Sequence, residues 1–132
     1  MKYLICVTVI MFLVLPFLAQ TVTNYNVNNG LPSNHIYSVT QDSEGYLWIA
    51  TNRGVVKYDG SDFKTFTTQD GLPNNDIHTL IPDKHGKIAF VSKSNVHGYI
   101  ENDSIQTFET KSGEVLQGSA NYYYIGDDHF WF

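Results

Sequence analysis

Short stretches of alternating or continuously apolar residues, each followed by turn residues, make up most of the chain after residue 30. Their lengths of four to six residues are typical of β-strands, and no window shows the 3.6-residue apolar period of a helix. Asp42-x-x-Gly45 and Asp59-Gly60 are turn signals, because Asp bonds the backbone ahead of it and Gly takes a positive φ. The pattern therefore predicts an all-β fold, in which the first four strands are Ile36–Gln41, Tyr46–Thr51, Val55–Tyr58 and Asp62–Thr67.

The same pattern returns after about 41 residues, which indicates an internal repeat. The segment GLPSN at 30–34 recurs as GLPNN at 71–75, and ten of 33 positions are identical between 30–62 and 71–103. In this alignment Val55 pairs with Val96, and one inserted residue beyond position 103 brings Thr65 into line with Thr107. A third copy is eroded, but Trp131 follows Trp48 by 83 residues, which is two periods.

The apolar residues within each repeat select one all-β architecture. Leu47–Ala50 and Ile88–Val91 are apolar at every position, so both faces of their sheets should be covered. The fourth strand, Asp62–Thr67, is more mixed, as expected for an edge strand. A four-stranded antiparallel sheet that repeats every 40–45 residues and is covered on both faces is typical of a β-propeller blade. A β-sandwich is the alternative, but its strands would not repeat in sequence with this period.

The first twenty residues differ from the rest of the chain. Lys2, an apolar stretch from Leu4 and the small residue Ala19 indicate a secretory signal peptide, with an uncleaved anchor as the alternative. The remaining strands number eleven, or about 2.75 blades of four, so we expect an incomplete ring and the N-terminal part of a longer protein. The expected segments are a signal peptide at 1–20, an outer strand that closes the last blade at 21–29, repeat 1 at 30–70, repeat 2 at 71–112 and the start of repeat 3 at 113–132.

Composition excludes several classes of function. The formal net charge of −5 leaves no basic surface for nucleic acid, and the single cysteine, Cys6, lies within the expected leader. The mature chain therefore has no thiol chemistry and no disulfide, so its core alone must hold the fold. Charged residues are only 16% and aromatic residues reach 14%, which argues against disorder. We expect an exported, periplasmic domain without a cofactor.

The repeat resembles that of the two-component regulator propeller family. Gly30 to Gly60 follows its pattern G-L-P-x-N…D-x-x-G-x-[LI]-W-[IF]-[AG]-T-x-x-G almost throughout, whereas Ala89 replaces the Trp in the second copy and Asn95 replaces the Gly. The resemblance implies the periplasmic sensor of a histidine kinase or hybrid two-component system, which often binds oligosaccharides. It further implies the remaining blades as partners, a possible homodimer of the full-length receptor, and inner-membrane anchoring through parts outside this sequence.

Catalytic motifs are lacking in the sequence. There is no Gly-x-Ser-x-Gly elbow and no metal-ligand spacing among the histidines, which we interpret as surface or turn residues. Asp42 and Asp83 could suggest calcium, but turn formation accounts for both. Trp48 could stack on a sugar, but its repetition at the blade period favours packing between blades. The histidines are His35, His78, His85, His97 and His129.

Candidate ligand-binding residues lie on loops, where binding residues are concentrated. In a four-stranded meander the connection between blades and the turn between the second and third strands emerge at the same end. Asn and Arg side chains suit hydroxyl-rich or carboxylated sugars, although Asn34 and Asn75 belong to the repeat and could merely shape the loop. The candidates are Asn34, His35, Asn52, Arg53, Asn75, Asp76 and Lys93.

These observations leave three functions open. A sensor propeller of a signalling receptor is the first, a secreted carbohydrate- or protein-binding propeller without a kinase is the second, and a propeller lyase or hydrolase with catalytic residues in further blades is the third. The sequence that follows residue 132 would separate them, because a membrane helix and kinase motifs support the sensor.

Overall fold

The computed structural model describes residues 22–94, 96–108, 124–126 and 129–131, the last two segments by their backbone only. The expected signal peptide at 1–20 lies outside the described residues. Within the described part of the chain the only helical element is the short 3-10 turn η1 (Val27–Asn29). The all-β prediction is therefore confirmed for this part of the chain.

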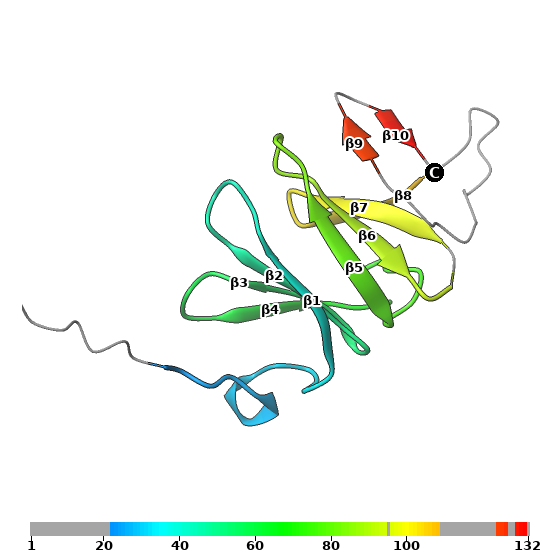
Figure 1. Ribbon diagram of the computed structural model, residues 1–132. Helices are drawn as coiled ribbons and strands as arrows, with labels where there is room; N and C mark the ends of the chain where they lie inside the picture. Colours follow the sequence, from blue (N-terminus) through cyan, green and yellow to red (C-terminus); the bar gives the residue numbers. More distant parts are fainter. Residues whose placement is uncertain (1–21, 95, 109–123, 127–128, 132) are drawn as a thin grey trace, which may run out of the picture.

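Two four-stranded antiparallel sheets, each a meander, lie side by side (Figure 1). Strand neighbours in each sheet are also neighbours in sequence, as predicted for propeller blades. The first sheet contains β1 (Ile36–Gln41), β2 (Leu47–Thr51), β3 (Gly54–Tyr58) and β4 (Phe63–Phe66). The second contains β5 (Ile77–Pro82), β6 (Ile88–Ser92), β7 (His97–Glu101) and β8 (Ser104–Thr107). A separate hairpin pairs β9 (Tyr124–Gly126) with β10 (His129–Trp131).

The hydrophobic core lies between the two sheets. Trp48 is only 3% exposed and stacks on Phe66 with ring centroids 5.8 Å apart. Its Nε1 donates a hydrogen bond of 2.7 Å to the Asp42 carboxylate, so the one polar atom of the indole is satisfied. Leu72 and Phe90 complete this core from the connection and from the second sheet. The interpretation of Trp48 as a residue that packs between blades is therefore confirmed.

The Asp-x-x-Gly segments form the turns predicted for them. Oδ1 of Asp42 accepts hydrogen bonds from the backbone N–H groups of Glu44 and Tyr46, both 3.0 Å long. Asp83 repeats the arrangement in the second sheet, where it accepts two bonds of 2.8 Å from backbone N–H groups. These bonds fix the turn that joins the first two strands of each sheet.

The position of the inserted residue is different from the predicted one. Ala50 pairs with Val55 across the β2–β3 turn, and Val91 pairs with His97 across the β6–β7 turn. Equivalent residues of the two sheets are therefore 41 positions apart before this turn, as in Ala50 and Val91, and 42 positions apart after it, as in Val55 and His97. The extra residue therefore lies in the turn between β6 and β7, and His97 occupies the place of Val55. His97 is only 3% exposed, so its interpretation as a surface or turn histidine is wrong.

The segment before β1 repeats the connection between the two sheets. Leu31 N–H donates to the carbonyl of Asn26, and Leu72 N–H donates in the same way to Thr67. Tyr25 lies on the outer face of the first sheet, where its hydroxyl is 2.6 Å from that of Tyr58. This contact raises the pKa of Tyr58 to about 12. Residues 22–26 form no strand among the described residues, and the expected closing strand at 21–29 stays a prediction.

Candidate functional site

The candidate site lies at the end of the sheets where the connections between blades enter their first strands; we call it the connection end. Residues 67–76, the β2–β3 turn and the described part of the β6–β7 turn lie at this end, where Lys93 N–H donates to the Asp76 carbonyl. Both first strands are irregular at this end: the pairing register shifts between Ile36 and Ser38 in β1 and between Ile77 and Thr79 in β5. Tyr37 and His78 are the extra residues. Such bulges redirect a side chain out of the regular alternation.

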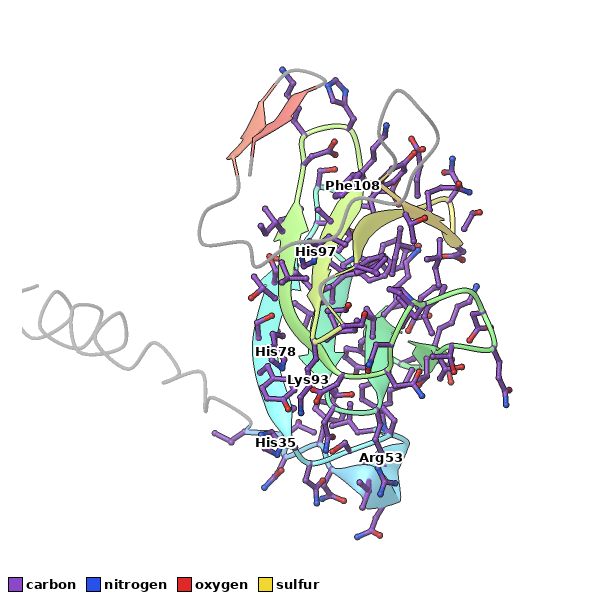
Figure 2. All side chains as sticks on the ribbon, turned by 90° about the vertical axis from the view of Figure 1, so that its right-hand side faces the viewer. His35, Arg53, His78, Lys93, His97 and Phe108 are labelled. Atoms are coloured by element: carbon purple, nitrogen blue, oxygen red, sulfur yellow. The ribbon has the colours of Figure 1, made fainter. Side chains whose placement is uncertain are left out.

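The two redirected side chains form a ladder with a third ring. The ring centroids of Tyr37 and His78 are 4.8 Å apart, which links the first sheet to the second. His35 extends the ladder, with its imidazole centroid 4.7 Å from the Tyr37 ring. All three residues are exposed. Figure 2 shows His35 and His78 on the same side of the molecule, and His78 and Lys93 both lie beside Asp76. The connection end therefore presents aromatic surface contributed by two blades.

A charged pair lies beside the ladder. Nζ of Lys93 is 3.3 Å from Oδ2 of Asp76, and the Lys93 backbone N–H donates a 2.9 Å bond to the Asp76 carbonyl. Oδ1 of Asp76 is buried and accepts no hydrogen bond from the described residues, although Nε2 of His78 lies 3.5 Å away. The sequence predicted that Asp76 and Lys93 share an end, and the structure brings them into contact.

Tyr37 and Asp76 shift each other's proton affinity. A hydrogen bond to the Asp76 carboxylate raises the pKa of the Tyr37 hydroxyl, because the bond and the nearby negative charge favour the protonated phenol. Burial by itself raises the pKa of Asp76, but the hydrogen bonds from Tyr37 and Lys93 outweigh it and hold that pKa below its ordinary value. Asp76 is therefore a carboxylate at neutral pH.

The two candidate asparagines from the repeat have structural bonds. The Asn34 carboxamide accepts a 3.0 Å hydrogen bond from the Val27 N–H, and that of Asn75 accepts a 2.7 Å bond from the Thr68 N–H. Both bonds join the start of the connection to its end, which supports the alternative that these side chains shape the loop. A ligand role for either residue stays a prediction.

The β2–β3 turn contributes Asn52 and Arg53, both exposed. The backbone N–H of Arg53 donates to Oγ1 of Thr51, which closes the turn. Figure 2 shows Arg53 at the same end as His35 but apart from Lys93. Among the described residues, the ion pairs of Asp76 do not include Arg53. The predicted candidates therefore share one end, but only some of them form a cluster.

Tyr37 and His78 were not among the ligand-binding residues predicted from the sequence. Their signal was present, because 78 follows 37 by the 41-residue period and the repeat pattern leaves that position unspecified. The packing of the repeat does not require a ring side chain at this position. A ring found there is therefore a candidate for contact with a ligand. The bulge that exposes them depends on strand pairing, which the sequence pattern does not specify.

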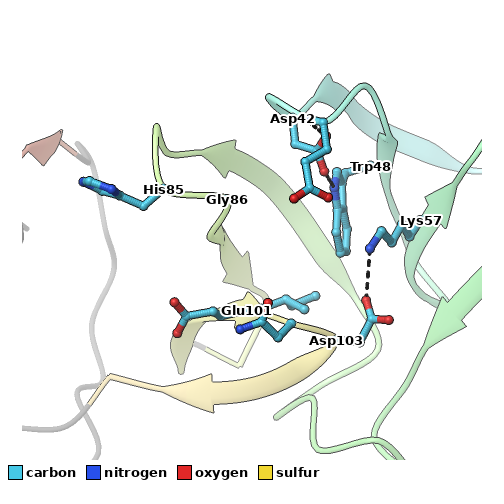
Figure 3. Close-up of a pocket in the computed structure, with 10 residues that line it drawn as sticks. Asp42, Trp48, Lys57, His85, Gly86, Glu101 and Asp103 are labelled. Atoms are coloured by element: carbon cyan, nitrogen blue, oxygen red, sulfur yellow. Dashed lines mark hydrogen bonds and ion pairs between the residues drawn. The ribbon is translucent and has the colours of Figure 1, made fainter.

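A hollow lies at the opposite end, between the two sheets (Figure 3). Its volume is about 110 Å³, and its lining is rich in carboxylates and includes the edge of Trp48. Lys57 lies in it with Nζ 4.2 Å from the centre of the Tyr46 ring and 3.2 Å from Asp103 of the second sheet. Asp103 also binds Lys64 at 2.8 Å. Through these ion pairs, Lys57 and Lys64 of the first sheet are linked to Asp103 of the second.

No group of three or more His, Cys, Asp or Glu side chains among the described residues could hold a metal ion. No helix in the part of the chain that the structure describes is long and apolar enough to cross a membrane.

Comparison with known proteins identifies the repeat. Residues 30–53 match the family described as "Two component regulator propeller". No curated protein matches the chain. The extracellular domain of a putative hybrid two component system from B. thetaiotaomicron is similar in structure, with a TM-score of 0.62 and 22% identity over 76% of this chain. A second such domain from the same organism gives a TM-score of 0.64 and 18% identity over 85% of this chain.

These similarities establish the fold. Residues 30–53 match the repeat of that family, and the two four-stranded sheets have the propeller-blade fold that the sequence predicted. The chain spans only 15% and 16% of the length of the two solved domains.

Proposed function

We propose that this chain, which carries a two-component regulator propeller repeat, belongs to a ligand-sensing propeller outside the cytoplasm and that its ligand is an oligosaccharide. The observation that supports this proposal most strongly is the exposed ladder of three rings beside the Asp76–Lys93 pair. Flat rings offer an apolar surface to the C–H face of a sugar, and the adjacent charged groups can bond to hydroxyl groups. Loops and bulges that a rigid sheet positions are common places for binding residues.

The proposed context is a receptor of the two-component type. The similar solved domains are described as extracellular domains of putative hybrid two component systems, which supports an exported location for this chain. The signalling activity would then belong to parts of the protein outside these residues, with the remaining blades as intramolecular partners. We propose that the described residues contribute to ligand binding, and we assign them no catalytic role.

Binding is tested on the natural protein at its full encoded length. A panel of neutral and acidic oligosaccharides is titrated by calorimetry, first against the wild type and then against Tyr37→Ala. Loss of the aromatic surface should weaken binding by about ten- to a hundredfold, which corresponds to roughly 1.4–2.8 kcal/mol.

Tyr25→Ala is the matched control, because Tyr25 is 42% exposed and Tyr37 is 39% exposed, yet Tyr25 lies on the outer face of the first sheet. Binding should survive the control substitution. Equal affinities for wild type and Tyr37→Ala would contradict the placement of the site. Lyase products in the titrated sugar would instead support the enzyme alternative, and a gene without a membrane segment and kinase would support a secreted binding protein.

A further inference from the structure

The charged pair of the connection end has its cation outside and its carboxylate inside. The Lys93 side chain is 67% exposed, whereas that of Asp76 is 19% exposed. One oxygen of Asp76 contacts the ammonium group, and the other is fully buried. A molecule that approaches from solvent therefore meets the ammonium group before it meets the carboxylate.

Three exposed rings lie beside this charged pair. Nε2 of His78 lies 3.5 Å from the buried oxygen of Asp76, so the His78 ring borders the charged pair. His35 and Tyr37 continue the same exposed surface. A ligand at this surface therefore meets an exposed ammonium group beside two imidazole rings and a phenol ring. The ammonium group suits an anionic partner, and the rings offer contact area.

The distribution of charge along the sheets favours an anion at this end. Between residues 22 and 108 the chain has nine carboxylates and six fixed cations. Seven of these carboxylates and four of the cations lie in the half of the sheets away from the connection end. The connection end has two cations, Arg53 and Lys93, and two carboxylates, Asp70 and Asp76, so its formal net charge is zero with histidine counted as neutral. An anion is repelled by the opposite end and not by this one.

We propose that the ligand of the connection end is an anionic sugar, whose carboxylate or sulfate ester binds Lys93 while its ring packs on Tyr37 and His78. This inference rests on the proposed function and narrows its ligand class. Lys93 contributes a charge-assisted hydrogen bond, and the ladder contributes the contact area. Asp76 is a positioning residue that holds Lys93 beside the rings.

The test compares an acidic sugar with its uncharged methyl ester and with a sulfated sugar. The natural protein at full length is titrated with an α-1,4-linked galacturonic acid trimer, with the methyl ester of the same trimer, and with a sulfated galactose trimer. The acid should bind at least about tenfold more tightly than its ester, because only the acid forms the charge-assisted bond. Binding of the sulfated trimer alone would identify the anion as a sulfate ester.

Lys93→Gln tests the residue that carries the inference, and Lys64→Gln is its matched control. Lys64 is 56% exposed and also paired with a carboxylate, Asp103, but it lies at the opposite end. The Lys93 variant should lose at least about tenfold in affinity for the anionic trimer and the salt dependence of that affinity. The Lys64 variant should keep both. Thermal unfolding of the two variants checks that each is folded.

Three results would overturn the inference. Equal binding of acid and ester would show that the site does not recognise charge. If Tyr37→Ala still abolished that binding, the proposed sugar site would be supported, but with a neutral sugar as its ligand. An unchanged affinity in Lys93→Gln would remove Lys93 from the site. Failure of both anionic trimers to bind, together with a neutral sugar whose binding Tyr37→Ala does not affect, would overturn the site and the inference together.

Discussion

Single residues close the turns of each sheet, and Gly54 at the start of β3 is the clearest case. Its φ is 124°, and a Cβ built on it would lie 2.3 Å from the carbonyl oxygen of Phe66 in β4. Gly60 also has a positive φ, 103°, but nothing lies within 4 Å of its Cβ position. Gly60 is therefore required only for its left-handed backbone conformation. Gly54 is required for that conformation and also because the β4 backbone leaves no room for a side chain.

We expect Gly54→Ala to be far more destabilising than Gly60→Ala. A left-handed conformation costs an L-residue about 1–2 kcal/mol, so Gly60→Ala should lower the free energy of unfolding by that amount. Gly54→Ala must in addition displace β4 from β3 and should lower it by at least about 3 kcal/mol. Urea unfolding of the natural protein and both variants measures the difference. Equal losses would show that β4 moves aside at no cost.

At the scale of elements, the β7–β8 turn joins the two sheets. Asn102 and Asp103 both have positive φ, 49° and 60°, as in the two-residue turns that favour tight hairpins. The turn holds the Asp103 carboxylate against Lys57 and Lys64 of the first sheet. The hydrogen bond from Lys64, followed by that from Lys57, lowers the pKa of Asp103 despite partial burial. The contact between blades at this end is therefore partly ionic.

This contact should weaken in acid. Because the pKa of Asp103 is lower in the folded state than in the unfolded chain, its stabilisation is complete above the unfolded value near 3.8 and is lost as the pH falls through the folded value. Asp103→Asn should therefore lower the melting temperature at pH 7, and this difference should shrink progressively as the pH falls below 3.8. A melting-temperature series from pH 7 to pH 2 measures this convergence. Parallel curves would show that other carboxylates cause the acid sensitivity.

At the scale of the whole molecule, the outer face of the first sheet is only partly covered. Leu31 packs there on Ile49 and Val56, and Tyr25 reaches Tyr58. Val39 of β1 nevertheless stays 56% exposed. In a ring of blades, a face of this kind packs against a neighbouring sheet. Apolar surface of this kind promotes association when it is left in water.

Residues 22–108 produced on their own should therefore self-associate. Their sheets would expose the outer face of the first blade, the far face of the second and open strand edges. Sedimentation velocity over a range of concentrations should show a rising average mass. A monodisperse monomer that unfolds in one cooperative transition would contradict this expectation and show that two blades form a sufficient core.

The sequence by itself determined the strands, the turns, the repeat and the residues of the core. These features depend on local chemistry and on a period that recurs in the chain: Asp42 forms its turn with its own neighbours, and Trp48 lies in a continuously apolar strand. The loop position of the ligand candidates followed from the same meander. The placement of Asp76 and Lys93 at one end followed in the same way, whereas their ion pair was found only in the structure.

Only the tertiary structure decided the register and the composition of the site. Strand pairing, not residue identity, determines which residues of the two sheets are equivalent, and it places the inserted residue in the β6–β7 turn. As a result His97 occupies the buried position that Val55 has in the first sheet. The bulges that expose Tyr37 and His78 arise from pairing with the second strand of each sheet. The ladder then forms because two blades stack, and residues 41 positions apart come into contact only through that packing.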